Sequence, residues 1–140
     1  MKTTDYPYTG KEGECQYDSS KKTASIKAYQ SNLAPSCKSV KALVAKGVTA
    51  STIAPSGIIF YRSGVYSNPI CGQDINHGVA IVGYGEDAKL NKKYWIVRNS
   101  WGKSWGDKGY IRMDMDVESE DHVGICGICE IASLPLIKLY

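Results

Sequence analysis

The sequence predicts an α+β fold: a mainly antiparallel, barrel-like β lobe with one short helix. Two observations indicate this. Most patterned segments are short, β-branched or alternating, and bounded by glycine or proline, whereas only 36–47 has a helical pattern. The run 79–82 is apolar at every position, which predicts a strand that is buried on both faces, as in a small barrel or sandwich.

Composition bounds the class of protein. A chain of 140 residues with 43% hydrophobic and 22% charged residues is typical of a globular domain that buries a sizeable core. The net charge of +3 is mild, and the basic residues form only doublets such as Lys21-Lys22 and Lys92-Lys93. No apolar run reaches membrane-spanning length, and the polar start at 1–5 is not a signal peptide. We therefore expect neither a nucleic-acid partner nor a membrane partner.

The helix at 36–47 has recognisable ends. Ser36 is a good N-cap, and Gly47 is a typical stop. Between them the apolar residues recur at positions i, i+3 and i+4, which predicts one buried stripe: Val40, Leu43 and Val44.

The remaining segments read as strands and loops. Strands are expected at 24–29, 48–53, 79–82, 94–99 and 110–115. In the first, Ile26 and the neighbouring aromatic Tyr29 are expected to face inward. A polar loop is expected over 86–93. After the last strand we expect an exposed acidic loop, formed by Asp114, Asp116, Glu118, Glu120 and Asp121.

One histidine and one asparagine stand out. His77 is at the head of the apolar strand, and Asn99 is at the tail of the next strand along the chain. Two strands joined by a short loop lie side by side, so the two residues should be near neighbours. A carboxamide oxygen that accepts the Nδ1–H of an imidazole fixes its tautomer and direction. This is the orienting half of a nucleophile–base–orienter triad.

The five cysteines favour disulfides and an oxidising compartment, and an odd number leaves at least one without an internal partner. Cys37 opens the helix, so a reactive thiol is an alternative to a disulfide there. Cys126 and Cys129 form a C-x-x-C that, with His122, resembles part of a zinc or redox site. The further ligands or β-α-β context that such sites need are absent from the sequence, so no metal is expected.

Several motifs together resemble the papain-like cysteine peptidase family, in the family's order and over nearly the whole chain. The matching pieces are Tyr6-Pro7-Tyr8, Phe60-Tyr61, Gly64-Val65-Tyr66, His77-Gly78 with 79–85, Asn99-Ser100-Trp101-Gly102, Trp105-Gly106, Gly109-Tyr110 and Gly124-Ile125-Cys126-Gly127. The resemblance implies the right, β-rich lobe of the papain-like fold over 29–133. It also implies the end of the helical left lobe over 1–28, and a tail at 134–140 that returns toward that lobe.

The resemblance also implies roles for residues. It implies hydrolysis of peptide bonds through a Cys-His-Asn triad, with His77 as base and acid and Asn99 as its orienter, and no cofactor. Trp101 would cover the bond between Asn99 and His77. Residues that match substrate-contacting positions are Ile75, Asn76, Gly78, Trp101 and Ile131. Isoleucine at the bottom of the main side-chain pocket would make that pocket apolar and shallow.

The cysteines acquire expected partners in the same way. The resemblance implies a disulfide between Cys71 and Cys126. It implies that Cys15 pairs in the family with an upstream cysteine, so we expect Cys15 to be unpaired here. Cys129 then has Cys37 as its one internal candidate. Cys71 lies close to His77 in sequence, so a substitute nucleophile is an alternative there, but the implied disulfide accounts for it.

The family's nucleophile signature, Cys-Gly-Ser/Ala-Cys-Trp/Tyr, is not found in this sequence. We therefore expect the chain to be the C-terminal portion of a longer enzyme, inactive alone, whose partners are the missing N-terminal lobe and a peptide or protein substrate. The alternative is a non-catalytic homologue or a peptide- or partner-binding module. The resemblance implies a lysosomal, vacuolar or secreted location.

Overall fold

The computed structural model describes residues 1–68, 70–72, 74–116 and 123–138. One α-helix, α1 (Cys37–Val44), and three short 3₁₀ helices accompany the strands; these are η1 (Ser19–Lys21), η2 (Ser56–Ile58) and η3 (Ile125–Gly127). The strands are β1 (Ser25–Ser31), β2 (Thr49–Ile53), β3 (Val65–Tyr66), β4 (His77–Asp87), β5 (Lys92–Arg98), β6 (Tyr110–Asp114) and β7 (Ala132–Lys138).

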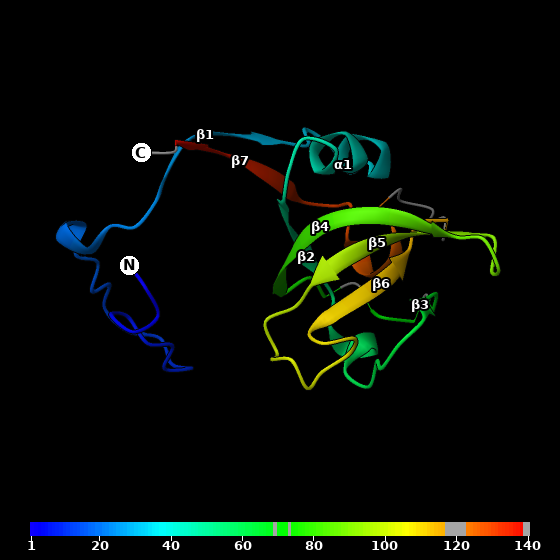
Figure 1. Ribbon diagram of the computed structural model, residues 1–140, viewed down its shortest axis with the longest axis horizontal. Coiled ribbons are helices and arrows are strands. Elements are labelled where there is room, and N and C mark those ends of the chain that lie inside the picture. The colour runs from blue at the N-terminus through cyan, green and yellow to red at the C-terminus, as the bar shows by residue number, and fades with distance from the viewer. Residues whose placement is uncertain (69, 73, 117–122, 139–140) are drawn as a thin grey trace.

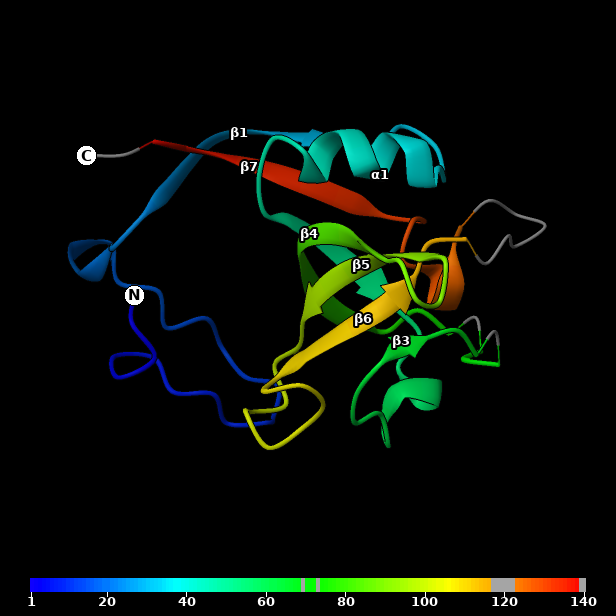
Figure 2. The same ribbon diagram turned by 45° about the vertical axis from the view of Figure 1, so that its right-hand side comes forward.

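All seven strands belong to one sheet, in the order β1-β7-β2-β4-β5-β6-β3. Every pairing is antiparallel except the short one between β3 and β6. The predicted α+β class with a mainly antiparallel sheet is therefore confirmed. β2, β4, β5 and β6 form the body of the molecule, while β1 and the end of β7 extend from it as a ribbon toward the N-terminal segment (Figures 1 and 2).

The helix has the predicted cap and stripe. The Ser36 side chain accepts a hydrogen bond from the Ser39 N–H, which satisfies one of the free donors of the first turn. The three stripe residues, Val40, Leu43 and Val44, are buried. Among the described helices, none is both long enough and apolar enough to cross a lipid bilayer.

The core lies between the helix and one face of the sheet. Its largest fully buried side chain is Trp95 on β5, which is edge-on to Tyr84 of β4 at 6.4 Å between ring centroids. Side chains from β2, β4, β5, β6 and η3 complete this cluster; they include Ile53, Val79, Ile81, Val97, Ile111, Met113, Ile125 and Ile128. The strand expected at 110–115 is observed as β6, on which Ile111 and Met113 are buried, and Met115 just after it packs against the cluster.

The prediction that 79–82 is buried on both faces is wrong. Val79 and Ile81 are buried, but Ala80 is only half-buried and Val82 is 37% exposed. One face of β4 covers the core, whereas the other forms part of an open cleft wall, described below. An apolar residue on such a face resembles a core residue in the sequence, which is why the run appears continuous.

The inward orientation expected for Ile26 and Tyr29 is also wrong, because both side chains are more than half exposed. β1 pairs only with β7, in a ribbon that leaves the body of the molecule (Figure 1). No described element covers either face of the ribbon at these two residues, so they have nothing to pack against.

The expected polar loop over 86–93 is shorter than predicted. β4 continues to Asp87, which pairs with Lys92 at the start of β5, so only 88–91 form the turn. The Asp87 Oδ1 accepts hydrogen bonds from the backbone N–H groups of Lys89 and Leu90 and so closes the turn. The polar composition of the strand ends hid their pairing.

Two disulfides connect the helix to the turn after η3 and the loop before β4 to η3 itself. Cys71 is bonded to Cys126, as expected, at a sequence separation of 55 residues. Cys37 is bonded to Cys129 at a separation of 92 residues, so the alternative of a reactive Cys37 is wrong. Cys15 is free and exposed, as predicted. Each closed loop of this length stabilises the fold by roughly 4 kcal/mol if chain entropy dominates.

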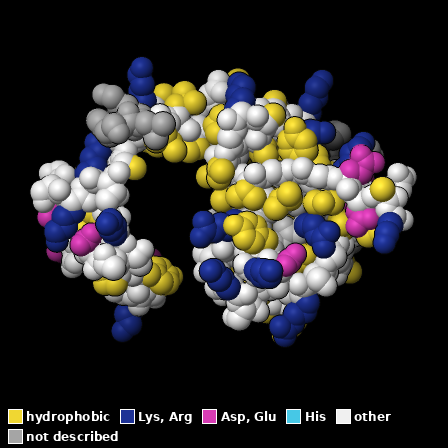
Figure 3. Space-filling model, viewed as in Figure 1, with side chains coloured by type: hydrophobic (Ala, Val, Ile, Leu, Met, Phe, Trp, Pro, Cys, Tyr) yellow, Lys and Arg dark blue, Asp and Glu magenta, His cyan; other side chains and the backbone are white. Residues whose placement is uncertain are grey.

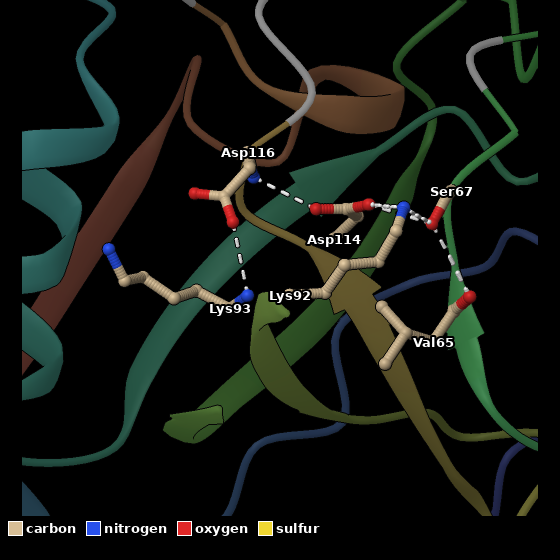
Figure 4. A network of polar contacts seen from close by, with 6 residues as sticks. All are labelled: Val65, Ser67, Lys92, Lys93, Asp114 and Asp116. Atoms are coloured by element: carbon tan, nitrogen blue, oxygen red, sulfur yellow. Dashed lines mark hydrogen bonds and ion pairs between the residues drawn. The ribbon is translucent and has the colours of Figure 1, made fainter. Parts of the chain in front are cut away.

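A buried carboxylate on β6 joins β5 and the residue that follows β3 at the far end of the sheet (Figure 4). Asp114 of β6 is 2% exposed, so the expectation that it belongs to an exposed acidic loop is wrong. Its Oδ2 accepts hydrogen bonds from the Lys92 ammonium at 2.5 Å and from the Ser67 hydroxyl at 2.7 Å, and its Oδ1 accepts one from the Asp116 N–H at 2.9 Å. Asp116 is exposed, and Glu118, Glu120, Asp121 and His122 lie outside the described residues.

These contacts shift the titration of the carboxyl group. Burial alone raises the pKa of Asp114, but the hydrogen bonds from Lys92, Ser67 and the Asp116 N–H outweigh it and hold the pKa below the ordinary value. A lowered pKa in the folded state adds stability above the unfolded pKa, and that stability is lost as the pH falls through the folded pKa.

We expect Asp114→Asn to lower the free energy of unfolding by about 2–3 kcal/mol at pH 7, because it leaves the Lys92 ammonium without its anion. The difference from the wild type should shrink below about pH 4, where an ordinary carboxyl group protonates. Urea unfolding at pH 7 and pH 3 measures both values. Asp116→Asn is the matched control, and an equal loss in both variants would contradict the role given to Asp114.

Candidate active site

His77 and Asn99 are hydrogen-bonded, with 2.8 Å between the His77 Nε2 and the Asn99 Oδ1. β4 begins at His77 and β5 ends at Arg98, and the two strands pair antiparallel, with Ala80 opposite Arg98. The head of one strand therefore lies beside the tail of the other, as the sequence predicted.

The nitrogen predicted to make this bond is wrong, because Nε2 and not Nδ1 faces Asn99. Nε2 is the ring nitrogen farther from Cβ, so it reaches from the start of β4 to Asn99 at the end of β5. The Nδ1 of His77 is thus left on the other side of the ring. An imidazole held through Nε2 keeps Nδ1 available to exchange a proton with another group.

The backbone fixes the orientation of the Asn99 amide. Its Oδ1 also accepts a hydrogen bond from the Ser100 N–H at 2.7 Å, so the oxygen is the atom directed at the ring. The Asn99 N–H donates to the Gly109 carbonyl at 3.0 Å, which ties the residue to the following loop. Asn99 is 7% exposed, and its Nδ2 has no hydrogen-bond partner among the described residues.

Three aromatic rings support the histidine. Trp101 lies over His77 with 5.0 Å between ring centroids and 32° between planes, and it is itself 37% exposed. Trp105 packs edge-on against Trp101 at 5.1 Å, and its Nε1 donates to the Ile59 carbonyl at 3.1 Å. Tyr61 contacts Trp105 at 5.8 Å. Trp101 thus covers one face of His77, and Trp105 and Tyr61 support Trp101 from behind. A hydrogen bond shielded from water is stronger and better directed.

The loop that carries these tryptophans depends on glycine at one point above all. Gly106 has φ +57°, and a Cβ atom there would lie 2.6 Å from the Tyr110 carbonyl oxygen and 3.1 Å from the Tyr61 ring. A side chain at this position would push apart the loop and the ring that supports Trp105.

A cleft of about 570 Å³ opens beside Asn99. Of the residues predicted from the sequence, Gly78, Asn99 and Ile131 line it. The other lining residues were not predicted: Ala50, Ser51, Thr52, Val79, Ala80, Arg98, Ser100 and Ser133. The alternation on β2 is the signal that was missed, since Thr49, Ser51 and Ile53 are buried, which turns Ala50 and Thr52 outward.

Four predicted site residues are not among those that line the cleft: Ile75, Asn76, His77 and Trp101. Trp101 stacks on His77, as described. Ile75 packs against the backbone of Gly127, where a Cβ atom would lie 2.6 Å from the Ile75 Cδ1. The Asn76 Nδ2 donates to the Asp74 carboxylate at 3.0 Å. Asn76 and Ile75 therefore belong to the loop before His77.

The cleft wall is mainly apolar, with Arg98 as the charged residue among those that line it. No group of three or more histidine, cysteine or acidic side chains suited to a metal occurs within the described ranges. The sulfurs of Cys126 and Cys129 are both in disulfides, which removes the metal and redox alternatives for that C-x-x-C. Cys71, bonded to Cys126, is likewise not a substitute nucleophile.

Comparison with known proteins gives one consistent result. The profile described as papain family cysteine protease matches residues 1–136. Cathepsin S of Bos taurus is 42% identical over 135 residues, which are 94% of this chain and 39% of that protein. Zingipain-2 of Zingiber officinale is 38% identical over 135 residues, which are 95% of this chain and 59% of that protein.

A solved structure agrees with the sequence matches. The bromelain protease from Ananas comosus in complex with the E64 inhibitor superposes with a TM-score of 0.82 at 36% identity, covering 97% of this chain and 62% of that chain. The chain thus spans less than two thirds of the length of the proteins that it matches.

We expect Trp101→Ala to speed the exchange of the His77 Nε2–H proton with water by about tenfold or more, because the ring no longer shields the bond to Asn99. Trp101→Phe keeps an aromatic cover and should change the exchange much less. The downfield imidazole proton signal in NMR spectra measures the rate. Equal rates in the wild type and Trp101→Ala would show that the indole is not the shield.

Proposed function

The chain belongs to the papain family of cysteine proteases, and from that membership we propose that it carries the histidine and asparagine of a Cys-His-Asn triad of a cysteine endopeptidase. The observation that supports this most is the bond between the His77 Nε2 and the Asn99 Oδ1, with Nδ1 directed away from it. His77 is the base and acid, and Asn99 is its orienter.

The chemistry is amide hydrolysis through an acyl-enzyme. The imidazole takes the proton of a thiol, which then attacks the peptide carbonyl as thiolate, and the imidazolium returns the proton to the leaving amine. A neutral amide suits this histidine, since it orients the ring without adding a second negative charge beside the thiolate. Trp101 and its supporting rings exclude water from one side of the pair.

The thiol in this proposal comes from outside these 140 residues. Four of the five cysteines are consumed by disulfides, and Cys15 lies in the exposed N-terminal segment. We therefore propose that the chain as given does not hydrolyse peptides. The absence of the nucleophile signature supports one alternative, a non-catalytic homologue that binds peptides or a partner in the same cleft.

The substrate is a peptide or protein whose chain lies along the cleft. The wall formed by Gly78, Ala80 and Ile131 is apolar, which favours an apolar side chain at the position that enters it. Ile131 is 56% exposed and projects into this space. A basic side chain would find no carboxylate among the residues that line the cleft.

We further propose the division into an end of the left lobe at 1–28, a β-rich right lobe at 29–133 and a tail at 134–140. Figure 3 shows an open space between the N-terminal segment and the body, with hydrophobic side chains along the edge of the body. The helical lobe of the same enzyme would fill this space. The two disulfides support an oxidising location, whether lysosomal, vacuolar or secreted.

We expect His77→Ala to lower kcat/KM of the full-length enzyme by about 10³-fold or more, because proton transfer to and from the reacting groups is lost. Asn99→Ala should lower it by about 10²-fold, since the ring is no longer aimed. Hydrolysis of a fluorogenic peptide measures both.

Asn68→Ala, at an exposed loop asparagine, is the control and should leave kcat/KM within twofold. A full-length protein that hydrolyses no peptide, although it binds peptides in the cleft, would replace the endopeptidase by the binding module.

The 140-residue chain alone should self-associate, because the apolar wall beside the N-terminal segment has no cover. Sedimentation velocity across a tenfold concentration range should show mass that grows with concentration, and adding the N-terminal lobe should restore a single species. A monodisperse monomer at all concentrations would contradict the proposed lobe interface.

A further inference from the structure

Ile131 occupies an unusual position in the chain. It lies between η3 and the first residue of β7, so it belongs to neither element, yet its side chain forms part of the cleft wall. The residues before it and after it, from Ile128 to Ala132, are held by several side chains and by one disulfide. The side chain that binds on both sides of Ile131 is Asn32.

The Asn32 carboxamide contacts the chain at three points around Ile131. Its Nδ2 donates to the carbonyls of Cys129 at 3.1 Å and Glu130 at 3.0 Å. Its Oδ1 accepts the Ala132 N–H at 2.8 Å. The backbone adds a fourth contact, because the Asn32 N–H donates to the Ala132 carbonyl at 3.2 Å.

Only an amide can make this set of bonds. The two carbonyls require a donor, and the Ala132 N–H requires an acceptor, so the oxygen and nitrogen of Asn32 have one consistent assignment. The Ala34 carbonyl lies 3.2 Å from the same Nδ2, so its two hydrogens are shared among three carbonyls, and the amide is also tied to its own turn. Asn32 thus connects the end of β1 to the segment that presents Ile131.

Other restraints act on the same segment. On the N-terminal side of Ile131, the Ser51 hydroxyl donates to the Ile128 carbonyl at 2.7 Å, and the Cys37–Cys129 disulfide holds Cys129. On its C-terminal side, Ala132 pairs with Ser51 of β2, so Asn32 is the side chain that contacts both neighbours of Ile131. The bonds of Asn32 to Glu130 and Ala132 hold the two residues that flank it, and therefore set the backbone from which its side chain enters the cleft.

We propose that Asn32 is a positioning residue for substrate selectivity: by holding both neighbours of Ile131, it fixes how far that side chain projects into the cleft. The inference rests on the proposed function, in which the cleft receives a substrate side chain. A fixed Ile131 makes the wall shallow and favours leucine over phenylalanine there. A loosened Ile131 moves aside and admits both.

The test uses three variants. Asn32→Ala removes all of the side-chain bonds, while Asn32→Asp keeps the acceptor for Ala132 but replaces the donors to Cys129 and Glu130. Gln30→Ala is the matched control: Gln30 lies on β1, two residues before Asn32, and its side chain accepts a hydrogen bond from the Lys46 ammonium at 3.1 Å, away from the cleft.

The first measurement needs no catalysis. Acetyl-leucine amide and acetyl-phenylalanine amide are titrated into the full-length protein, which includes the N-terminal lobe and carries labelled isoleucine methyl groups, and the Ile131 signal is followed. We expect the dissociation constant of the phenylalanine amide, divided by that of the leucine amide, to fall about 3- to 10-fold in both Asn32 variants. This is a part of the discrimination that one apolar pocket provides. Gln30→Ala should keep the wild-type ratio.

The second measurement uses the full-length enzyme and peptides that differ only by leucine or phenylalanine at the discriminated position. The kcat/KM of the leucine peptide, divided by that of the phenylalanine peptide, should fall by the same factor in the Asn32 variants, while kcat for the leucine peptide stays within twofold. A general loss of structure would lower kcat for both peptides and leave their ratio unchanged.

Unchanged ratios in both measurements would overturn the inference, and so would a uniform loss of affinity for both amides. A wild-type enzyme that cleaves no peptide would refute the proposed function alone, and the amide titration would still decide the role of Asn32.

Discussion

The antiparallel pairing of β4 with β5 is the constraint on which the site depends. It places His77, the first residue of β4, beside Asn99, the residue that follows β5. The two side chains therefore meet at 2.8 Å although they are distant in sequence. The pairing runs from Ala80 and Arg98 to Asp87 and Lys92. A slip of one residue would turn Val79 and Ile81 away from the core, so burial of these side chains also fixes the register that sets the site.

Sequence patterns predicted what depends on local periodicity or on chain order. The cap and stripe of α1 and the proximity of His77 to Asn99 follow from residues that lie on one element or at the two ends of one hairpin. The failures concern what covers an element. Ile26 and Val82 are apolar, as core residues are, but they lie where the described chain provides no partner. Asp114 is the opposite case. It is charged, as surface residues are, but it is buried, because Lys92 on another strand supplies its cation.

The choice of histidine nitrogen shows a second limit. The sequence indicates that an amide meets an imidazole, but which nitrogen it meets depends on side-chain direction at both strand ends. The cleft shows the same limit. Its walls come from β2, β4, the end of β5 and the residues around the start of β7, and no single stretch of sequence contains more than a part of it. The role of Asn32 is invisible in sequence for this reason, since its partners lie about a hundred residues further along the chain.

The two disulfides are nested, since Cys71 and Cys126 both lie between Cys37 and Cys129. A backbone cut anywhere between Cys37 and Cys129 therefore leaves the two pieces covalently joined, and a cut between Cys71 and Cys126 leaves them joined twice. In a compartment rich in proteases, such a nicked molecule keeps its cleft, its histidine and its asparagine in one body. Damage of this kind would be visible on a reducing gel and absent from a non-reducing one.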